Sequence, residues 1–230
     1  MIKAKPKKCK GIGKAVEYGC GNEVMKRING LCQSCYGKFI ANDTGKIEKA
    51  IEKARRIRDA AEKKIVKERK VELMSTTAYW SKVVQPVINE IARLIDKGLP
   101  CISSGNFPDV AHGGHYISVG ANRTLSLNLH NIHLQSVESN HFKGGDMIRY
   151  REGLINRYGL KYVEFIEGLK KCPILSLSKK DLMTIHEKAK KVRNTLKNGE
   201  FATFESRISA RNIVNDILGI YPMEFSAFVE

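Results

Sequence analysis

The first forty residues constrain the fold most, because they place four cysteines among many glycines in a segment too short to fold by burying apolar surface alone. Cys32 and Cys35 form a CxxC pair, whereas Cys9 and Cys20 are eleven positions apart. A closed structural zinc site takes four ligands, and these cysteines supply four. We therefore predict a tetrahedral zinc site with four cysteine ligands, with free cysteines in a loose tail as the alternative.

Composition narrows the classes of protein that remain. The 230 residues carry 40 basic and 24 acidic side chains, and this net charge of +16 predicts a polyanionic partner, first of all nucleic acid. With 42% apolar residues, a wholly disordered basic tail is excluded. No apolar run approaches the roughly 18 residues needed to span a bilayer, and no apolar stretch follows the basic N-terminus. We expect a cytoplasmic protein without a membrane partner.

Helical periodicity covers most of the chain after the cysteines. The segment from Thr44 to Leu73 repeats apolar residues at helical spacing and carries eleven basic and five acidic side chains between Lys46 and Lys70. It predicts one long helix, either a solvated linker or a DNA-contacting element. Further helices are predicted at 80–97, 147–157, 162–169 and 206–218, and a capping box of Ser178 and Asp181 precedes one more.

Residues 99–146 lack this periodicity and hold five of the six histidines, which are His112, His115, His130, His133 and His141. Two short strands are predicted at 116–119 and 124–127, joined by a Gly-Ala-Asn turn. Histidines on strands and loops can supply metal ligands and a general base near neutral pH, which phosphodiester cleavage requires. One histidine alone is more often structural, so the prediction depends on the cluster.

The order of the polar residues in this segment is more specific than their number. His115 lies at the first strand, Asn131 ends the hairpin, and Asn140 with His141 opens a helix. This strand–strand–helix order resembles the catalytic unit of HNH, or ββα-metal, nucleases.

A closer resemblance extends over about residues 78–160. It is carried by CISSG, AHGGHYIS, NIHLQSVESNHFKGG and YREGLINRYG, which follow WSKVVQPVINEIARLIDKGLPC. These stretches resemble CISCG, AGHY, NIHxQCxxCNxxxxG and a tyrosine-rich helix in the bacteriophage NinG/Rap recombination endonucleases. The cysteine-rich front is similar to a module at the start of some family members. A phage-encoded protein of this kind is expected in the cytoplasm of the host cell.

The resemblance implies roles for the matching residues. His115 matches the general base, and Asn131 matches the asparagine that braces the catalytic loop and orients this base. Asn140 matches a ligand of the catalytic ion, Mg²⁺ or Mn²⁺. Together they imply one-metal hydrolysis, in which neutral His115 deprotonates the attacking water.

Other positions leave alternatives open. His112 is the expected second metal ligand with Asp109 as its competitor, and His141 can replace Asn140. His130 and His133 are expected to orient the site or to contact DNA. The expected DNA contacts are Arg123, His133, Lys143, Arg149 and Arg151.

One departure from the family pattern concerns its two CxxC pairs, which hold a structural zinc ion. In this chain the four positions are Cys101, Ser104, Ser136 and Ser139, so three of the four ligands are missing. The resemblance therefore implies no zinc ion there, and serine hydrogen bonds or packing must hold the unit together. Cys101 and Cys172 are expected to be buried apolar cysteines.

We predict an α+β, mainly helical fold with a small HNH-like ββα unit embedded between helices. The expected divisions are a zinc module at 1–43, a basic helix at 44–75, the nuclease unit at 76–160 and a helical region at 161–230. The expected function is metal-dependent cleavage of branched DNA, a Holliday junction or a D-loop, in phage recombination, with a homodimer as one possible state. The alternatives are a non-catalytic DNA-binding or annealing factor and a general HNH nicking endonuclease.

Overall fold

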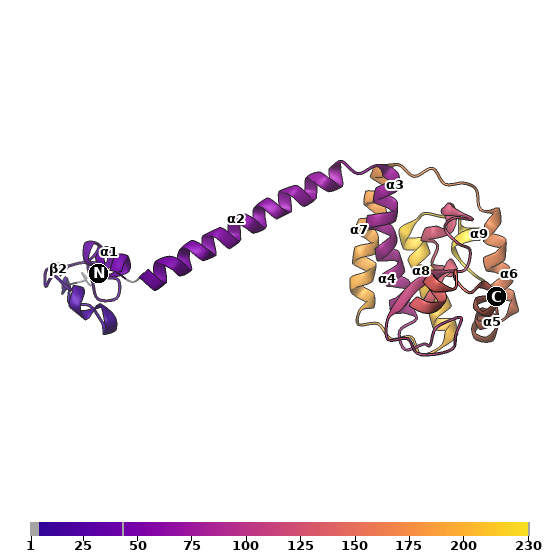
Figure 1. Cartoon of the computed structure of the whole chain (residues 1–230), viewed down its shortest axis with the longest axis horizontal. Helices are drawn as coiled ribbons and strands as arrows, with labels where there is room; N and C mark the ends of the chain where they lie inside the picture. The colour runs from indigo at the N-terminus through magenta and orange to yellow at the C-terminus, as the bar shows by residue number, and fades with distance from the viewer. Residues whose placement is uncertain (1–4, 43, 230) are drawn as a thin grey trace. The chain divides into compact units, whose positions relative to one another are not determined.

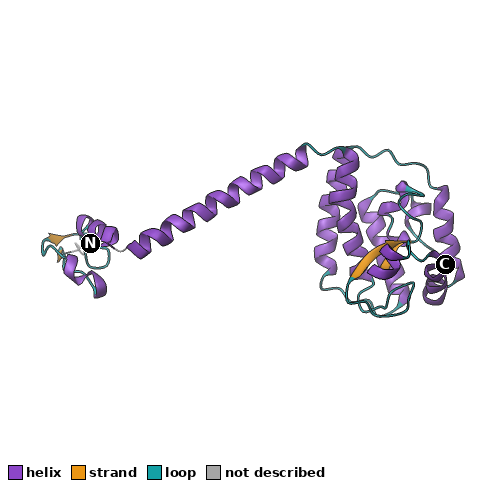
Figure 2. Cartoon of the chain, viewed as in Figure 1, coloured by secondary structure: helices purple, strands orange, loops and turns teal. Residues whose placement is uncertain are grey.

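The computed structural model describes residues 5–42 and 44–229, and the chain divides into two units, Met1–Glu72 and Leu73–Glu230. The described part is mainly helical and contains two antiparallel two-stranded sheets (Figure 2). The expected α+β, mainly helical class is therefore confirmed, whereas the finer division into four parts stays a prediction. No described helix is both long and apolar enough to cross a membrane.

The cysteine-rich part of the first unit has a very small core. Strand β1 (Lys7–Lys8) pairs with β2 (Glu23–Val24), a 3-10 turn covers Gly13–Tyr18, and helix α1 covers Gln33–Asn42. Its buried apolar residues are Cys9, Ala15, Leu31, Cys35 and Phe39. A core of this size supplies little hydrophobic stabilisation, so a metal crosslink would contribute much of the stability of this module.

The predicted basic helix is present as α2 (Thr44–Glu72). Its described side chains are almost all exposed, and Ile51 and Ile65 retain 63% and 64% of their accessible surface. Intrahelical ion pairs such as Glu52–Arg56, at 2.8 Å, support the helix without tertiary packing. The helix therefore presents its excess of positive charge to solvent.

The second unit begins with a continuous helical run. Helix α3 (Thr76–Tyr79) is capped by Ser75, a π-helical turn covers Trp80–Val84, and α4 (Gln85–Ile95) follows. Pro86 lacks a backbone N–H, and it follows the π-helical turn directly, where the α-helical ladder is already interrupted because the N–H of Gln85 donates to the carbonyl of Trp80. Gly98 has a φ of 82°, a conformation that favours glycine and ends the run as predicted.

The hairpin of the second unit is displaced from its predicted position. Strand β3 (Ala111–His115) pairs with β4 (Ile132–Ser136), in the register His112 with Gln135 and His115 with Ile132. The predicted strand at 124–127 is a 3-10 turn, Arg123–Leu127, and the predicted strand at 116–119 belongs to the connecting loop. The two strand predictions are therefore wrong, although both fall inside the long connection of the real hairpin.

Two glycines explain why β3 has no alternating apolar pattern. A Cβ atom on Gly113 would lie 2.9 Å from the backbone oxygen of Asn89 in α4, and one on Gly114 would overlap the side chain of Gln135. The strand needs glycine here for close approach to its neighbours, although glycine weakens the intrinsic strand preference. Because these tertiary contacts require glycine, the sequence of β3 lacks the pattern from which a strand is predicted.

The remaining helices surround the hairpin. They are α5 (Met147–Tyr158), α6 (Leu160–Gly168), α7 (Lys179–Leu196), α8 (Phe204–Leu218) and α9 (Met223–Ser226). The predicted capping box of Ser178 and Asp181 is confirmed at the start of α7, which packs beside α4 (Figure 1). The predicted helices at 147–157, 162–169 and 206–218 correspond to α5, α6 and α8.

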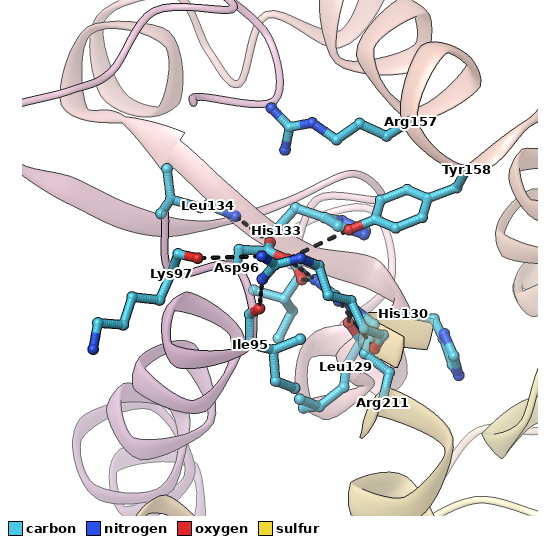
Figure 3. Close-up of polar contacts among 12 residues, drawn as sticks. Ile95, Asp96, Lys97, Leu129, His130, His133, Leu134, Arg157, Tyr158 and Arg211 are labelled. Atoms are coloured by element: carbon cyan, nitrogen blue, oxygen red, sulfur yellow. Dashed lines mark hydrogen bonds and ion pairs between the residues drawn. The ribbon is translucent and has the colours of Figure 1, made fainter. Parts of the chain in front are cut away.

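A buried ion pair joins α8 to the end of α4 beneath the hairpin (Figure 3). Arg211 and Asp96 have fully buried side chains, with 2.7 Å between Nη2 and Oδ1. Asp96 Oδ2 also accepts the backbone N–H of Leu134, and Arg211 Nε donates to the carbonyl of Leu129. The pair therefore fixes α4, β4 and the segment before β4 to one another, which sets the position of the histidine-rich loop.

Candidate functional site

The four predicted zinc ligands converge in the first unit. The sulfur atoms of Cys9, Cys20, Cys32 and Cys35 all lie within 4.8 Å of one another, and Cys20 and Cys32 are 4.0 Å apart. Tetrahedral zinc with Zn–S bonds of about 2.3 Å would place its sulfurs about 3.8 Å apart. The donor set and its spacing therefore fit a bound ion such as zinc. In the described part of the chain, no other group of three or more His, Cys, Asp or Glu has such spacing.

The surroundings of the four thiols shift the pKa values of two of them. The backbone N–H of Cys32 donates to Cys9 Sγ over 3.1 Å, and this bond lowers the pKa of Cys9 to about 7. The neighbouring Cys32 side chain and burial raise the pKa of Cys35 to about 12. Four thiols this close cannot all ionise without a compensating cation, so metal binding would release protons.

In the second unit, His115 lies at the end of β3, and one of its two ring nitrogens forms a hydrogen bond. His115 Nε2 lies 3.0 Å from the backbone oxygen of Ser126, and because a carbonyl only accepts, Nε2 carries the proton. Gln85 donates to the same oxygen. The lone pair is then on Nδ1, which has no hydrogen-bond partner among the described residues. Burial lowers the pKa of His115, against the effect of the Ser126 carbonyl, so the ring is neutral near pH 7.

Asn131 lies immediately before β4 and is fully buried. Its Oδ1 accepts the N–H of Ile117 at 2.7 Å, and its Nδ2 donates to the carbonyls of Ile117 and Leu125 at 2.9 and 3.2 Å. One side chain therefore ties together both ends of the loop between residues 117 and 125. This loop leads into Ser126, so Asn131 helps to fix the carbonyl that orients His115.

The structure brings His112 and Asn140 together. Asn140 lies in a π-helical turn, Glu138–Phe142, directly after β4, and its Nδ2 is 3.1 Å from His112 Nδ1. Both side chains are half-buried. Two predicted ligands, 28 positions apart in the sequence, thus meet in space.

His115 and the His112–Asn140 pair do not share a face of the hairpin. Residues three apart on a strand point to opposite faces, so His115 lies on the α4 side, with Gln85, and His112 on the other. Gly113 and Gly114 separate them and add no side chain. Both glycines are buried, against Asn89 on one face and Gln135 on the other, so no open path joins the two groups across the strand.

Two other predicted ligands remain apart from this pair. Asp109 is exposed and has no hydrogen bond or ion pair to any described residue. His141 is also exposed, and its ring stacks on Phe142 with 5.2 Å between centroids. Of the four predicted ligands of the catalytic ion, His112 and Asn140 contact each other, whereas Asp109 and His141 do not contact this pair.

His130 and His133 belong to the core, so of their two expected roles, orienting the site or contacting DNA, burial excludes the second. Both are fully buried. His130 contacts the hydroxyl of Tyr162 at 2.9 Å and donates to the Ser226 carbonyl, and burial lowers its pKa to about 3. Burial also places the pKa of His133 well below its usual range. Neutral rings packed against tyrosines stabilise the fold and leave no surface for a phosphate.

The predicted DNA-contacting cations are accessible but differ in their partners. Arg149 is exposed, and Lys143 forms a 2.7 Å ion pair with Glu138. Arg151 is half-buried and pairs with Glu167 at 2.9 Å. Arg123 lies over the ring of Trp80. Arg123 and Arg149 are thus the two that hold no carboxylate among the described residues.

Several residues that position this site carry no motif in the sequence. Ser126 and Gln85 orient His115, and Asn215 in α8 accepts the N–H of Leu129 at 3.1 Å. The one available signal is in α8, where Arg207 and Arg211 share the apolar face of the helix with Val214 and Leu218. Arginines on an apolar stripe indicate a buried ionic contact.

The residues at the positions of the family's second zinc site, Cys101, Ser104, Ser136 and Ser139, lie close together. Cys101 Sγ accepts the backbone N–H of Ser136 at 3.2 Å and that of Ser104 at 3.4 Å. Burial raises the pKa of Cys101, but hydrogen bonds from these two serines outweigh it and lower the value to about 7. Hydrogen bonds to one sulfur thus link the loop at 101–104 to the end of β4. Cys101 and Cys172 are buried, as expected.

These features describe a mainly helical α+β protein with a four-cysteine cluster and a polar hairpin site. The family described as "Bacteriophage Lambda NinG protein" matches residues 1–200. The chain therefore belongs to the NinG family.

Individual relatives cover a shorter stretch. Protein ninG of Enterobacteria phage H19B is 40% identical over 92 residues, which is 40% of this chain and 46% of the relative. The ninG proteins of Escherichia phage lambda and Salmonella phage P22 are 40% and 39% identical over 92 residues. The chain spans about half the length of these curated relatives. No solved structure matches it.

Proposed function

We propose that the second unit is a metal-dependent DNA endonuclease of the ββα-metal type. The proposal is supported by the hairpin β3–β4, which is followed by a π-helical turn at Glu138–Phe142 and then by α5. In this proposal His115 is the general base and Asn131 its positioning residue, with His112 and Asn140 as ligands of one Mg²⁺ or Mn²⁺ ion.

The observation that carries the proposal is the state of His115. A general base must be neutral and must direct a lone pair at water. The Ser126 carbonyl holds the proton on Nε2, burial lowers the pKa, and Nδ1 remains available. Exposure distinguishes His115 from the core histidines: His130 engages both ring nitrogens, and His133 leaves Nε2 without a partner but is fully buried, whereas His115 is half-buried.

The metal site of this proposal depends on His112 and Asn140. A neutral imidazole nitrogen and an amide oxygen can both bind Mg²⁺ or Mn²⁺, with waters and a phosphate oxygen filling the remaining positions. The ion would stabilise the charge that develops on the phosphate. Two protein ligands without a carboxylate would hold it weakly, so we expect the DNA phosphate to contribute to metal binding.

A second candidate is a DNA-binding or annealing factor without cleavage activity. The position of His115 and His112 on opposite faces of the hairpin favours this alternative, because catalysis needs both groups at one phosphate. The resemblance to recombination endonucleases supports branched DNA as the substrate in either case. A nicking endonuclease without junction preference is the third possibility.

One assay separates these functions. Labelled four-way junction, D-loop and linear duplex are each incubated with the full chain in Mg²⁺, in Mn²⁺ and in EDTA. We expect metal-dependent cleavage, with the branched substrates cut faster. Equal cleavage of all three supports the general nicking enzyme, and binding without cleavage in either metal contradicts an endonuclease.

For the first unit we propose a zinc-stabilised module that grips DNA. Its four sulfurs suit zinc, and the exposed helix α2 adds many basic side chains that have no buried partner. Contacts with phosphates would position the chain on DNA without reading its sequence.

A further inference from the structure

A pocket of about 270 Å³ opens beside the histidine site of the second unit. It lies between the start of the α3 run and the segment before α7, and Thr77, Trp80, Arg123, Thr124, Ile174 and Leu175 contribute to its wall. This volume is below the roughly 300–1,000 Å³ of pockets for drug-sized ligands, so it suits a small planar group.

One wall of the pocket is a planar cation stacked on an aromatic ring. The guanidinium carbon of Arg123 lies 5.2 Å from the centroid of the Trp80 ring, and its Nη2 donates to the Thr77 carbonyl at 3.3 Å. Arg123 is exposed, whereas Trp80 is only 7% exposed. A guanidinium held in this way offers a flat, positively charged surface on which a nucleobase can stack.

The opposite rim carries an apolar side chain in water. Ile174 retains 92% of its accessible surface, which is the largest exposed fraction among the large apolar residues of the described chain. Apolar side chains that project from DNA-binding proteins can insert between bases and separate a step of the stack. Ile174 is thus an exposed apolar side chain at the rim of the pocket, where a base that enters would contact it.

The pocket is connected to the proposed general base through a single residue. Trp80 Nε1 donates to Ser126 Oγ at 2.9 Å, and the backbone oxygen of Ser126 accepts the proton of His115 Nε2. The buried residue Ser126 thus fixes both the indole of Trp80 and the ring of His115, and the free Nδ1 of His115 lies on the side of the ring away from Ser126.

We infer that this pocket binds one unpaired nucleobase of a DNA strand. The inference rests on the proposed function for the meaning of that strand as a substrate, but not for the binding itself. The cationic wall and the net charge of +16 favour nucleic acid over a peptide. An unpaired base has both ring faces free for stacking, which would give a preference for branched over fully paired DNA.

Trp80 allows a direct test because it is the only tryptophan of the chain. Its fluorescence is followed in EDTA, so that no cleavage is needed, while the full chain is titrated with two DNAs of equal length. One is a continuous duplex, and the other carries a short unpaired thymidine stretch. The variants are Arg123→Ala and, as the control, Lys161→Ala, which removes one exposed positive charge on α6.

We expect unpaired thymidines to quench Trp80 more strongly than duplex does. Arg123→Ala should weaken binding of the unpaired DNA about tenfold and that of the duplex much less. Lys161→Ala should weaken binding of both DNAs equally and slightly. Photocrosslinking of 5-iodouracil in the unpaired stretch should label the peptide that contains Ile174.

Equal quenching by both DNAs, or equal effects of Arg123→Ala and Lys161→Ala, would overturn the pocket assignment. Quenching by an acidic peptide in place of DNA would do the same. If the pocket binds unpaired DNA but no metal supports cleavage, the endonuclease proposal fails and the pocket stands. If cleavage occurs but unpaired DNA does not quench Trp80 more than duplex does, the pocket assignment fails and the endonuclease proposal stands.

Discussion

Burial divides the histidines of this chain into groups that the sequence presents as one cluster. His130 and His133 lie in the core, His141 is exposed, and His112 and His115 are half-buried at the hairpin. Sequence spacing predicts that they gather in one segment, but it cannot tell which rings point inward. That depends on α8, whose Arg211 and Asn215 hold the segment before β4 from more than 80 positions away.

Because His130 and His133 are buried as neutral rings, we expect the folded protein to lose stability in acid. Burial lowers the folded-state pKa of His130 to about 3 and places that of His133 well below its usual range, whereas an unfolded histidine titrates near about 6.5. Below pH about 6.5 the unfolded chain therefore binds protons that the folded chain excludes. For His130 alone the free energy of unfolding should fall by about 1.4 kcal/mol per pH unit until about pH 3, and His133 should add to this fall.

Denaturant unfolding at several pH values measures this slope. His141→Gln, which changes an exposed histidine, should leave the slope unchanged, whereas His133→Gln should make it shallower. An unfolding free energy that stays constant from pH 7 to pH 5 would contradict the account of these two rings.

The structural elements differ in how far the sequence predicts them. Helices α2, α5, α6, α7 and α8 follow from apolar periodicity and caps, which are local properties. Strand β3 cannot be predicted in this way. Its sequence, AHGGH, lacks the alternation of apolar and polar residues, and its two glycines are required by close packing against Asn89 and Gln135, which are distant in the sequence. The candidate site is predicted in part: residue types and the His112–Asn140 contact follow from the motif order, but Ser126 and Gln85 do not.

The four-cysteine cluster yields a prediction on metal content. We expect one zinc ion per chain in the purified protein, because four sulfurs converge in the first unit and Cys101 is the one cysteine at the serine-substituted positions. Cys32→Ser should abolish zinc binding and Cys101→Ser should retain it. Two zinc ions per chain, or loss of zinc in the Cys101→Ser protein, would show that the site is assigned wrongly.

At the scale of the whole molecule, charge and chemistry belong to different units. The second unit has its own core and the histidine site, whereas the first combines the cysteines with the basic helix α2. The net charge of the chain predicts a polyanionic partner, and the two units can contribute to its binding to different extents.

A truncated protein that begins at Thr76 tests this division. It should fold around Val84, Ile88 and Ile91, which are fully buried, and should bind DNA more weakly than the full chain. The slope of log affinity against log salt should become shallower by about 0.9 for each duplex phosphate that the truncated protein no longer neutralises. Unchanged affinity and slope on a four-way junction would remove the first unit from the DNA-binding surface.

The central claim, that His115 is the general base of a nuclease, is tested most directly by comparing cleavage with binding in His115→Ala. His186→Ala serves as the matched control, since His186 lies on α7 beside Tyr79 and outside the proposed site. Cleavage by His115→Ala should be lost while DNA affinity stays near wild type, and the wild-type rate should fall only as pH drops below about 6.5, because the pKa of His115 is lowered. Cleavage by His115→Ala within tenfold of wild type would contradict the account.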